Sequence, residues 1–256
     1  MSTAQAFVGW FRAWGHVGRF ALAAFAAAFA RSTYTPITRA AALQQVYFTA
    51  WQPLPGFVLF STVLSLVVIQ VTITAARGYG LAGYALELVF RVLVLELLPF
   101  VTALMVALRS GSAINTEVAL MHASGELAAM RDARVDPMQR EFVPRLVAAA
   151  MSVVSLTVLT CAIALALAYL VMYGFSPWGF QEYTRTIANV FSLPILAGFL
   201  LKAAAFGVVV AAIPISAGLE ATHNLKSAPI AVMGGMVRLV LALALIEIVS
   251  VAAKYV

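Results

Sequence analysis

The stretch LVAAAMSVVSLTVLTCAIALALAYLVMY, residues Leu146–Tyr173, decides the fold class. Its 28 residues carry no charged side chain, and an α-helix needs ~20 predominantly apolar residues to cross a bilayer. Four further stretches have the same character: Phe57–Ala76, Tyr84–Leu108, Ile187–Ile213 and Pro229–Ala253. The sequence therefore predicts an all-α polytopic membrane protein with five transmembrane helices.

The composition of the whole chain supports this prediction. Of its 256 residues, 63% are hydrophobic and 10% are charged, whereas a soluble domain is ~45–50% apolar and ~25% charged. A water-soluble fold of this length could not bury so much apolar side chain, so a soluble enzyme is excluded. The net charge of +6 then bears on which loops face the cytoplasm, and we expect no nucleic-acid partner. The single cysteine, Cys161, excludes an intrachain disulfide and a cysteine-based metal cluster, and we expect no metal site.

The first 56 residues differ from the rest of the chain. They hold four arginines and no acidic residue, with Trp10, Phe11 and Trp14 among the first of them. A basic, aromatic-rich segment of this kind is typical of a helix that lies on an anionic membrane surface. We therefore divide the chain into an N-terminal interfacial region, 1–56, and a transmembrane domain, 57–256. The stretch 20–30 leaves an alternative open, the core of a signal peptide.

Lysines and arginines are distributed unevenly over the segments between the spans. With the N-terminus inside, the inner segments hold ten of them, the outer segments hold three, and three lie within spans. The outer three are Arg77, Arg185 and Lys254. Because loops rich in Lys and Arg stay in the cytoplasm, the sequence predicts a cytoplasmic N-terminus and a C-terminus on the outer side.

One sizeable polar segment, 109–145, follows the second span and faces the cytoplasm in this orientation. Ile114, Val118 and Met121 recur there at helical spacing, and Asp136-Pro137 is a capping pair that starts the helix leading into the third span. Two interpretations stay open, a solvated connector and a docking helix for a soluble partner. The second interpretation gives the apolar residues of the segment something to pack against.

Residues 95–145 also carry an ordered series of short motifs. The series is Glu96-Leu97-Leu98-Pro99, Arg109-Ser110-Gly111-Ser112-Ala113, Glu117, Met121, Glu126-Leu127, Val135-Asp136-Pro137 and Pro144-Arg145. In this order and spacing it resembles the MlaE/YrbE family, the permeases of MCE-associated ABC transporters that move phospholipids between membranes. The similarity extends more weakly over 40–256. Leu98 departs from the Glu-Leu-Gly-Pro of the family, and residues 217–228 match its pattern poorly.

The resemblance implies a bacterial inner-membrane permease that forms a homodimer, with an ABC ATPase subunit on the cytoplasmic side and an MCE-domain protein on the periplasmic side. ATP would be bound by the ATPase, and this chain would hold no cofactor; it has no Gly-rich phosphate loop ending in Lys-Ser or Lys-Thr. Phospholipid would pass through a cavity between the two permeases. Segment 109–145 would contain the coupling helix, and the residues expected to contact the ATPase are Glu117, Glu126, Leu127, Met130 and Asp136.

Two charged residues near the middle of spans are the candidate lipid-binding residues. A charge at the bilayer centre costs roughly 2.5–3.5 kcal/mol, so each needs a partner. Glu96, which matches the Glu of the family motif, acts either as a structural bridge or as a gate at the cavity. Lys202, where the resemblance also places a Lys, pairs either with Glu96 or with a lipid phosphate. Tyr79, at the outer end of the first span, lines the cavity mouth or is an ordinary interfacial tyrosine, while Glu87 and Arg91 are expected to pair with each other.

Two other functions remain alternatives. A stand-alone small-solute or ion permease would need several polar residues along one pathway, but the first and third spans carry no charge. An intramembrane enzyme would combine Glu96 with His122, which the predicted topology places in the membrane and the cytoplasm respectively. Arg238 and Glu247 of the fifth span are too far apart to pair directly, ~13 Å along a helix axis, and each can bridge to another helix.

Overall fold

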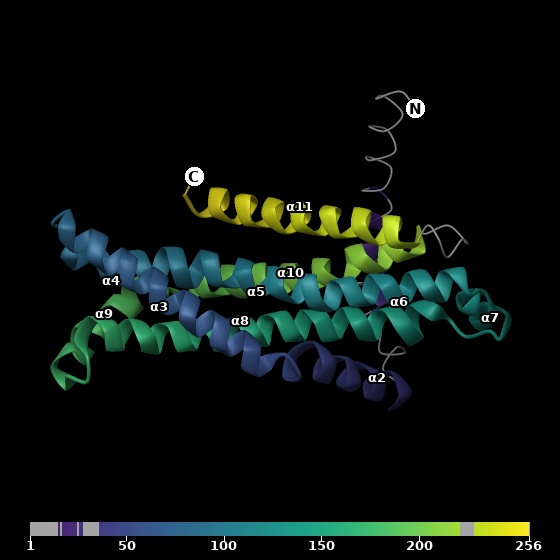
Figure 1. Cartoon of the computed structure of the whole chain (residues 1–256), viewed down its shortest axis with the longest axis horizontal. Helices are drawn as coiled ribbons and strands as arrows, with labels where there is room; N and C mark the ends of the chain where they lie inside the picture. The colour runs from purple at the N-terminus through teal and green to yellow at the C-terminus, as the bar shows by residue number, and fades with distance from the viewer. Residues whose placement is uncertain (1–14, 16, 25, 28–35, 221–227, 256) are drawn as a thin grey trace, which may run out of the picture.

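The structure is a computed structural model that describes the chain outside residues 1–14, 16, 25, 28–35, 221–227 and 256. Within the described residues every regular element is helical, and five helices are long and apolar enough to cross a membrane. They run Leu54–Gly78, Ala85–Ala123, Met138–Tyr173, Leu193–Leu219 and Val232–Lys254. Figure 1 shows them as a bundle of long helices arranged along one axis. The predicted all-α membrane fold with five spans is confirmed.

The spans contain the following elements. The first is α3 (Leu54–Gly78), and the second is a continuous helical run of α4 (Ala85–Leu88), η4 (Val89–Leu97), α5 (Leu98–Val106), η5 (Ala107–Gly111) and α6 (Ser112–Ala123). The third comprises η6 (Met138–Phe142) and α8 (Val143–Tyr173), the fourth is α10 (Leu193–Leu219), and the fifth lies in α11 (Ala228–Tyr255). Shorter elements precede or connect them: α2 (Pro36–Val46), η2 (Tyr47–Trp51), η3 (Ala82–Tyr84), α7 (Glu126–Asp132), η7 (Pro177–Gly179) and α9 (Phe180–Val190).

The fourth span begins later than the sequence analysis places it. One helix over 187–213 was expected, but α9 ends at Val190 and α10 starts at Leu193. Ser192 between them is extended, with ψ 156°, and Pro194 lies in the first turn of α10. Proline has no N–H for the carbonyl four residues earlier, so it is accepted in a first turn and breaks a helix elsewhere. The predicted start at 187 is therefore wrong.

The second span extends further than the sequence analysis places it. The expected boundary at Leu108 lies inside η5, and the helical run continues through α6 to Ala123. The polar segment 109–145 thus begins as an extension of a membrane helix. Two parts of this run, η4 and η5, have the wider π-helical turns, which in other helices frequently mark functional sites.

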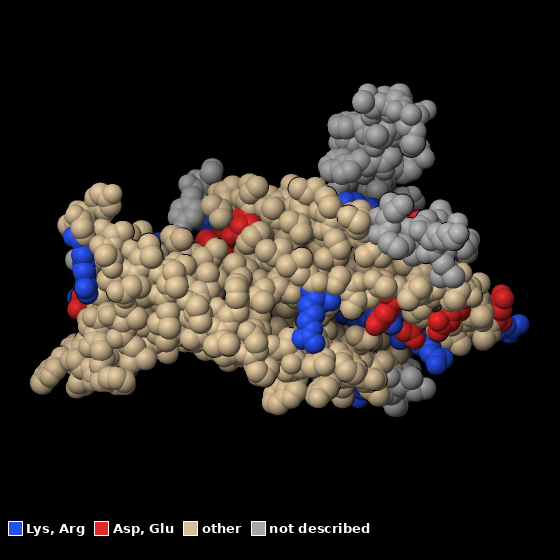
Figure 2. All heavy atoms as spheres, in the orientation of Figure 1, with Lys and Arg blue, Asp and Glu red and all other residues tan. Residues whose placement is uncertain are grey.

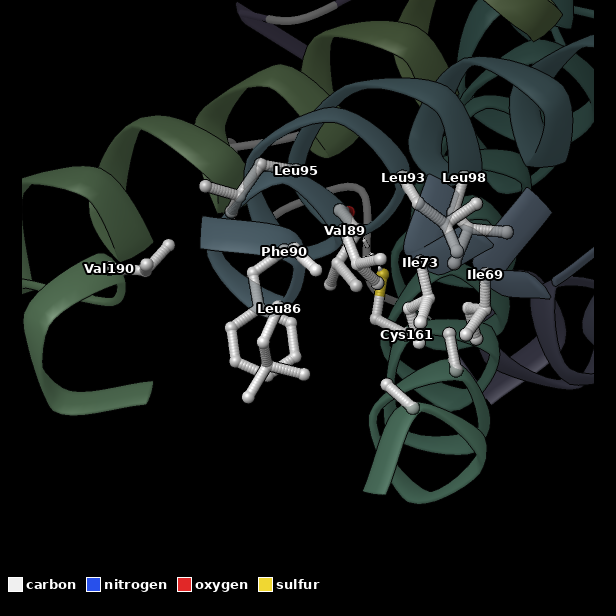
Figure 3. Packing of buried hydrophobic residues seen from close by; sticks show 14 of the residues in the cluster. Ile69, Ile73, Leu86, Val89, Phe90, Leu93, Leu95, Leu98, Cys161 and Val190 are labelled. Atoms are coloured by element: carbon white, nitrogen blue, oxygen red, sulfur yellow. Dashed lines mark hydrogen bonds between the residues drawn. The ribbon is translucent and has the colours of Figure 1, made fainter. Parts of the chain in front are cut away.

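The core is built around α8 and α10, which contact each other and most of the other spans. Figure 3 shows one part of it, where Ile69 and Ile73 of α3 lie close to Cys161 of α8. At the crossing of α8 and α10, a Cβ on Gly207 would come within 2.4 Å of the Cα of Ala150. Small residues permit such close approach of membrane helices, and this contact fixes the position of α10 in the bundle.

The described part of the N-terminal region packs on the bundle. The helix α2 lies beside α8 (Figure 1), and Ala24 is buried among residues of the spans. Tyr47, Phe48 and Trp51, at the end of this region, are exposed. Aromatic side chains in this situation are enriched where a membrane meets water. The aromatic cluster at residues 10–14 lies outside the described residues.

The ends of the bundle differ from its middle. In Figure 1, α6 and α7 lie at one end and α4 and α9 at the other. Figure 2 shows that the visible surface between them is mostly free of charged side chains, while Lys, Arg, Asp and Glu gather toward the α6–α7 end. One acidic patch interrupts the uncharged surface near the C-terminal end of α11. This patch belongs to the candidate site described next.

Candidate functional site

Four charged side chains from three helices meet within the membrane-spanning part of the bundle. Lys202 of α10 lies at the centre, with its Nζ 2.5 Å from Oε2 of Glu96 in η4 and 3.2 Å from Oε2 of Glu247 in α11. The other oxygen of Glu96, Oε1, lies 2.5 Å from Nζ of Lys254, also in α11. These residues form an alternating ionic network, Glu247–Lys202–Glu96–Lys254, whose formal charges sum to zero.

A backbone carbonyl completes the surroundings of Lys202. Its Nζ donates a hydrogen bond to the carbonyl oxygen of Leu95 at 2.9 Å. Pro99 lies four residues after Leu95 and has no N–H to donate to that carbonyl. The sequence thus removes one backbone donor near this carbonyl, in the same helical turn as Glu96, and the ammonium group of Lys202 donates to it.

Lys202 is shielded from solvent, whereas Glu96 and Lys254 are more exposed. The side chain of Lys202 is 2% exposed, whereas those of Glu96 and Lys254 are 14% and 21% exposed. A buried ion is tolerated only when partners compensate the loss of its hydration, and Lys202 has two carboxylates and a carbonyl. The more exposed members can exchange partners, so the site can offer an ammonium group to an anion or a carboxylate to a cation.

Tyr79 is not brought into this network. It caps the C-terminal end of α3 and is 83% exposed, and within the described residues no hydrogen bond joins its side chain to Glu96 or Lys202. Its place at the cavity mouth stays a prediction.

A second ionic group lies at the α6–α7 end of the bundle. Arg145 of α8, with its side chain 9% exposed, pairs with Glu141 of η6 at 2.9 Å and with Glu117 of α6 at 3.3 Å. It thereby holds the start of the third span against the end of the second. Asp136 accepts a hydrogen bond on Oδ1 from the backbone N–H of Met138 at 2.9 Å, so its predicted capping role is confirmed.

The expected docking surface of α6 and α7 needs one correction. Leu127 is only 3% exposed and packs with Val118 and Phe142 inside the bundle, because the apolar face of α7 turns toward the spans. The expectation that Leu127 contacts a soluble partner is therefore wrong. Glu126 is exposed and Met130 half-buried, so both remain candidates for such a contact.

Sequence comparison shows the relationship that the motifs suggested. The family model described as Permease MlaE matches residues 42–253, a range that holds nearly all of the five spans and three members of the ionic network. The chain belongs to the MlaE permease family.

Individual relatives of this MlaE-family chain are more distant. It is 33% identical over 154 residues to the intermembrane phospholipid transport system permease protein MlaE of Haemophilus influenzae, which covers 55% of this chain and 59% of that protein. It is 31% identical over 134 residues to the "Probable ABC transporter permease protein" of Synechocystis sp., which covers 51% of this chain and 50% of that protein. The chain thus matches about half to three-fifths of the length of these relatives.

The sequence analysis of this MlaE-family chain did not identify Glu247 and Lys254 as site residues. Lys254 was counted with the outer loops, and Glu247 was assigned only a general bridging role. The signal was present, because these two opposite charges are seven residues apart in an apolar helix. Residues at that spacing lie two turns apart on the same helix face.

Two further ion pairs involve charged residues of the spans. Arg91 Nε lies 2.8 Å from Glu87 Oε1, which confirms the predicted pair within one helix. Arg238 of α11 lies 2.9 Å from Glu220, the residue that follows α10, so it does connect two spans. Within the described residues, no group of three His, Cys, Asp or Glu side chains is placed to hold a metal ion.

Proposed function

We propose that this chain is the permease subunit of an ABC transporter that moves phospholipid between membranes, driven by ATP that a separate ATPase subunit binds and hydrolyses. The observation that carries the proposal is the match of the Permease MlaE family over residues 42–253. The name of the Haemophilus relative, an intermembrane phospholipid transport permease, supports the choice of cargo. Five apolar spans with one ionic network among them suit a molecule with apolar chains and a charged headgroup.

The proposed location is the bacterial inner membrane, with a cytoplasmic N-terminus and a periplasmic C-terminus. The ratio of ten to three Lys and Arg residues supports this orientation. The structure places Arg109, Arg140 and Arg145 of the inner set, and Arg77 and Lys254 of the outer set, within the spanning helices, which leaves seven against one. The α6–α7 end of the bundle then faces the cytoplasm and the α4–α9 end faces the periplasm.

The proposed partners follow from this orientation. An ABC ATPase subunit would dock on the exposed face of α6 and α7, where Leu120, Glu126 and part of Met130 are accessible. An MCE-domain protein would dock at the opposite end. A second copy of the chain would complete a homodimer, with the lipid cavity between the two copies.

The proposed handling of the lipid uses the ionic network. Lys202 and Glu96 would lie where the polar headgroup of the lipid binds in the cavity. The apolar surfaces of the spans would contact its acyl chains. A lipid phosphate can take the place of Glu96 on Lys254, because both are anions and Lys254 is the more exposed lysine. The ammonium of Lys202 would stay fixed by the carbonyl of Leu95 during this exchange.

The test is ATP-dependent lipid transfer by the assembled transporter. The chain is co-expressed with the ATPase encoded in the same genome, purified, and reconstituted in liposomes that contain a fluorescent phospholipid. We expect transfer to acceptor liposomes that requires ATP and is lost with an ATPase variant that cannot hydrolyse it. Failure to co-purify with any ATPase, together with solute or ion flux by the chain alone, would contradict the proposal and support a stand-alone permease.

A further inference from the structure

Two cavities meet where the N-terminal region joins the second span. One has a volume of about 440 Å³ and the other about 580 Å³. Both are lined by Thr49 and Gln52 from the N-terminal region and by Arg109 and Ser110 of η5. The two cavities therefore adjoin at these polar side chains, which form their junction, and we call the pair the groove. Each cavity has a volume in the range of small-molecule sites.

The two halves of the groove differ in chemistry. The smaller half is walled largely by apolar side chains, among them Phe57 of α3, Met105 and Val106 of α5, and Leu156 of α8. The larger half is lined by amides and carboxylates, including Gln45, Glu117 and Glu141. A ligand that fills both halves must be apolar at one end and polar at the other.

The charged groups around the groove sum to zero but are separated in space. Arg109 at the junction donates a hydrogen bond to the neutral amide of Gln52 at 3.1 Å, and among the described residues no carboxylate lies within ion-pairing distance of it. Glu117 and Glu141 share the single cation of Arg145, which leaves one negative charge in excess. The groove thus offers a positive junction and a negative outer half.

The order of these groups along the second span matches the order of groups in a phospholipid. Met105 and Val106 come first, Arg109 and Ser110 follow, and Glu117 is nearest the α6–α7 end. The exposed aromatic residues of η2 lie next to the junction in the chain, which places Arg109 at the depth of the lipid headgroups. Acyl chain, phosphate and the end of the headgroup would meet the apolar wall, the arginine and the carboxylates in turn.

From these observations we propose that the groove binds one phospholipid from the leaflet on the α6–α7 side of the membrane. The headgroup of this lipid carries a phosphate and a primary ammonium, as in phosphatidylethanolamine. The phosphate is held by Arg109 and Gln52, and the ammonium donates hydrogen bonds toward Glu117 and Glu141. This site is separate from the Glu96–Lys202 network and does not depend on the proposed transport function.

The charge pattern predicts selectivity among headgroups. Phosphatidylcholine has the same charges but no N–H to donate to a carboxylate, and phosphatidylglycerol has a phosphate but no cation for the acidic half. Each loses one interaction of about the strength of an exposed ion pair, which corresponds to about fivefold in affinity. Ethanolamine phosphate, which has the headgroup without acyl chains, is not expected to compete, because it leaves the apolar half empty.

The test is site-mapped photocrosslinking of the full-length chain. A phosphatidylethanolamine with a diazirine in its acyl chain is added to the purified protein in detergent, and the crosslinked peptides are identified by mass spectrometry. We expect crosslinks within residues 49–57 and 105–110, with unlabelled phosphatidylethanolamine competing about fivefold better than phosphatidylcholine or phosphatidylglycerol of the same chains. Equal competition by all three lipids, or no crosslink in these peptides, would overturn the proposal.

Matched variants locate the effect within the groove. Gly56 lines the apolar half, and a side chain there meets no neighbour within 4 Å of its Cβ, so Gly56→Leu fills the groove without forcing the helix apart. Gly78 ends the same helix and is equally unobstructed, so Gly78→Leu is its control. We expect Gly56→Leu and Arg109→Gln to lower crosslinking in these peptides about fivefold or more, and Gly78→Leu and Arg77→Gln to leave it unchanged. Crosslinking that is the same in Gly56→Leu and wild type would contradict the assignment.

Discussion

Lys202 donates a hydrogen bond to the carbonyl oxygen of Leu95, 2.9 Å away on a different span. Pro99, four residues further on, has no N–H to offer this carbonyl. A backbone carbonyl of the second span is therefore hydrogen-bonded by the ammonium group of a lysine from the fourth span. The same ammonium holds Glu96 and Glu247, so the backbone of the second span fixes the centre of the ionic network.

This relationship predicts that Lys202 and Pro99 are energetically coupled. Lys202→Met should lower the free energy of unfolding by about 3 kcal/mol, because it leaves Glu247 without its cation. In a Pro99→Ala background the new N–H can serve Leu95, so the cost of Lys202→Met should fall by ~1 kcal/mol. The control background is Pro214→Ala, which also removes a proline from inside a helix. Thermal or chemical unfolding in detergent measures the free energies of the six proteins, which are the three backgrounds with and without Lys202→Met. An equal cost of Lys202→Met in all three backgrounds would refute the coupling.

The two lysines of the network should differ in their contribution to stability. Lys254 is 21% exposed and contacts one carboxylate, whereas Lys202 is 2% exposed and contacts two. Lys254→Met should therefore cost ~1 kcal/mol or less, well below the cost of Lys202→Met, and Lys254→Arg should be close to neutral. Melting curves of the three purified variants provide the comparison. A larger loss for Lys254→Met than for Lys202→Met would reverse the assigned order.

Leu127 is buried and Leu120 is exposed at the α6–α7 end, so substitutions at these two positions should affect fold stability and ATPase docking separately. Leu127→Asp places a carboxylate among buried apolar residues, so it should destabilise the fold by ~3 kcal/mol or more. Leu120 is 48% exposed on α6, and Leu120→Asp should leave stability within ~0.5 kcal/mol while lowering the amount of ATPase that co-purifies. Unchanged co-purification for Leu120→Asp would remove α6 from the proposed docking surface.

The proposed orientation predicts opposite labelling of two serine positions. Cys161, the single natural cysteine, is buried, so it is first replaced by alanine. A cysteine at Ser124, between α6 and α7, should then react with an impermeant maleimide only from the cytoplasmic side. A cysteine at Ser176, which precedes η7 at the other end, should react only from the periplasmic side. Labelling in the reverse pattern would contradict both the topology and the proposed ATPase contact.

The sequence was sufficient for the class of fold but not for every boundary. Five apolar stretches of the right length define the spans because the bilayer sets that length. Hydrophobicity alone does not mark Pro194, which ends the preceding helix and delays the fourth span to Leu193. It also could not show that the second span continues as α6, since polar residues can extend a helix beyond the membrane without changing its backbone.

Only part of the candidate site could be predicted from the sequence. Glu96 and Lys202 stand out as isolated charges at similar depth, and a partner for each is a physical requirement. Helical periodicity gives the face on which a residue lies, but not which other helix that face meets. For this reason the contribution of α11 through Glu247 and Lys254, and the inward direction of Leu127, emerged only from the packing of the helices.

The most direct test of a role for the ionic network in lipid transport is ATP-dependent phospholipid transfer by the double variant Glu96→Gln, Lys202→Met. Its melting curve is recorded in parallel. The net charge of the network is unchanged, but Glu247 loses its cation and Lys254 loses its carboxylate, so the double variant should melt below the wild type and close to Lys202→Met alone. If the network meets the lipid headgroup, the double variant should transfer lipid at least about tenfold more slowly than the wild type at a temperature where both are folded, a barrier increase of ~1.4 kcal/mol. A stable double variant with full transfer would contradict the account and assign Glu96 and Lys202 to structure alone.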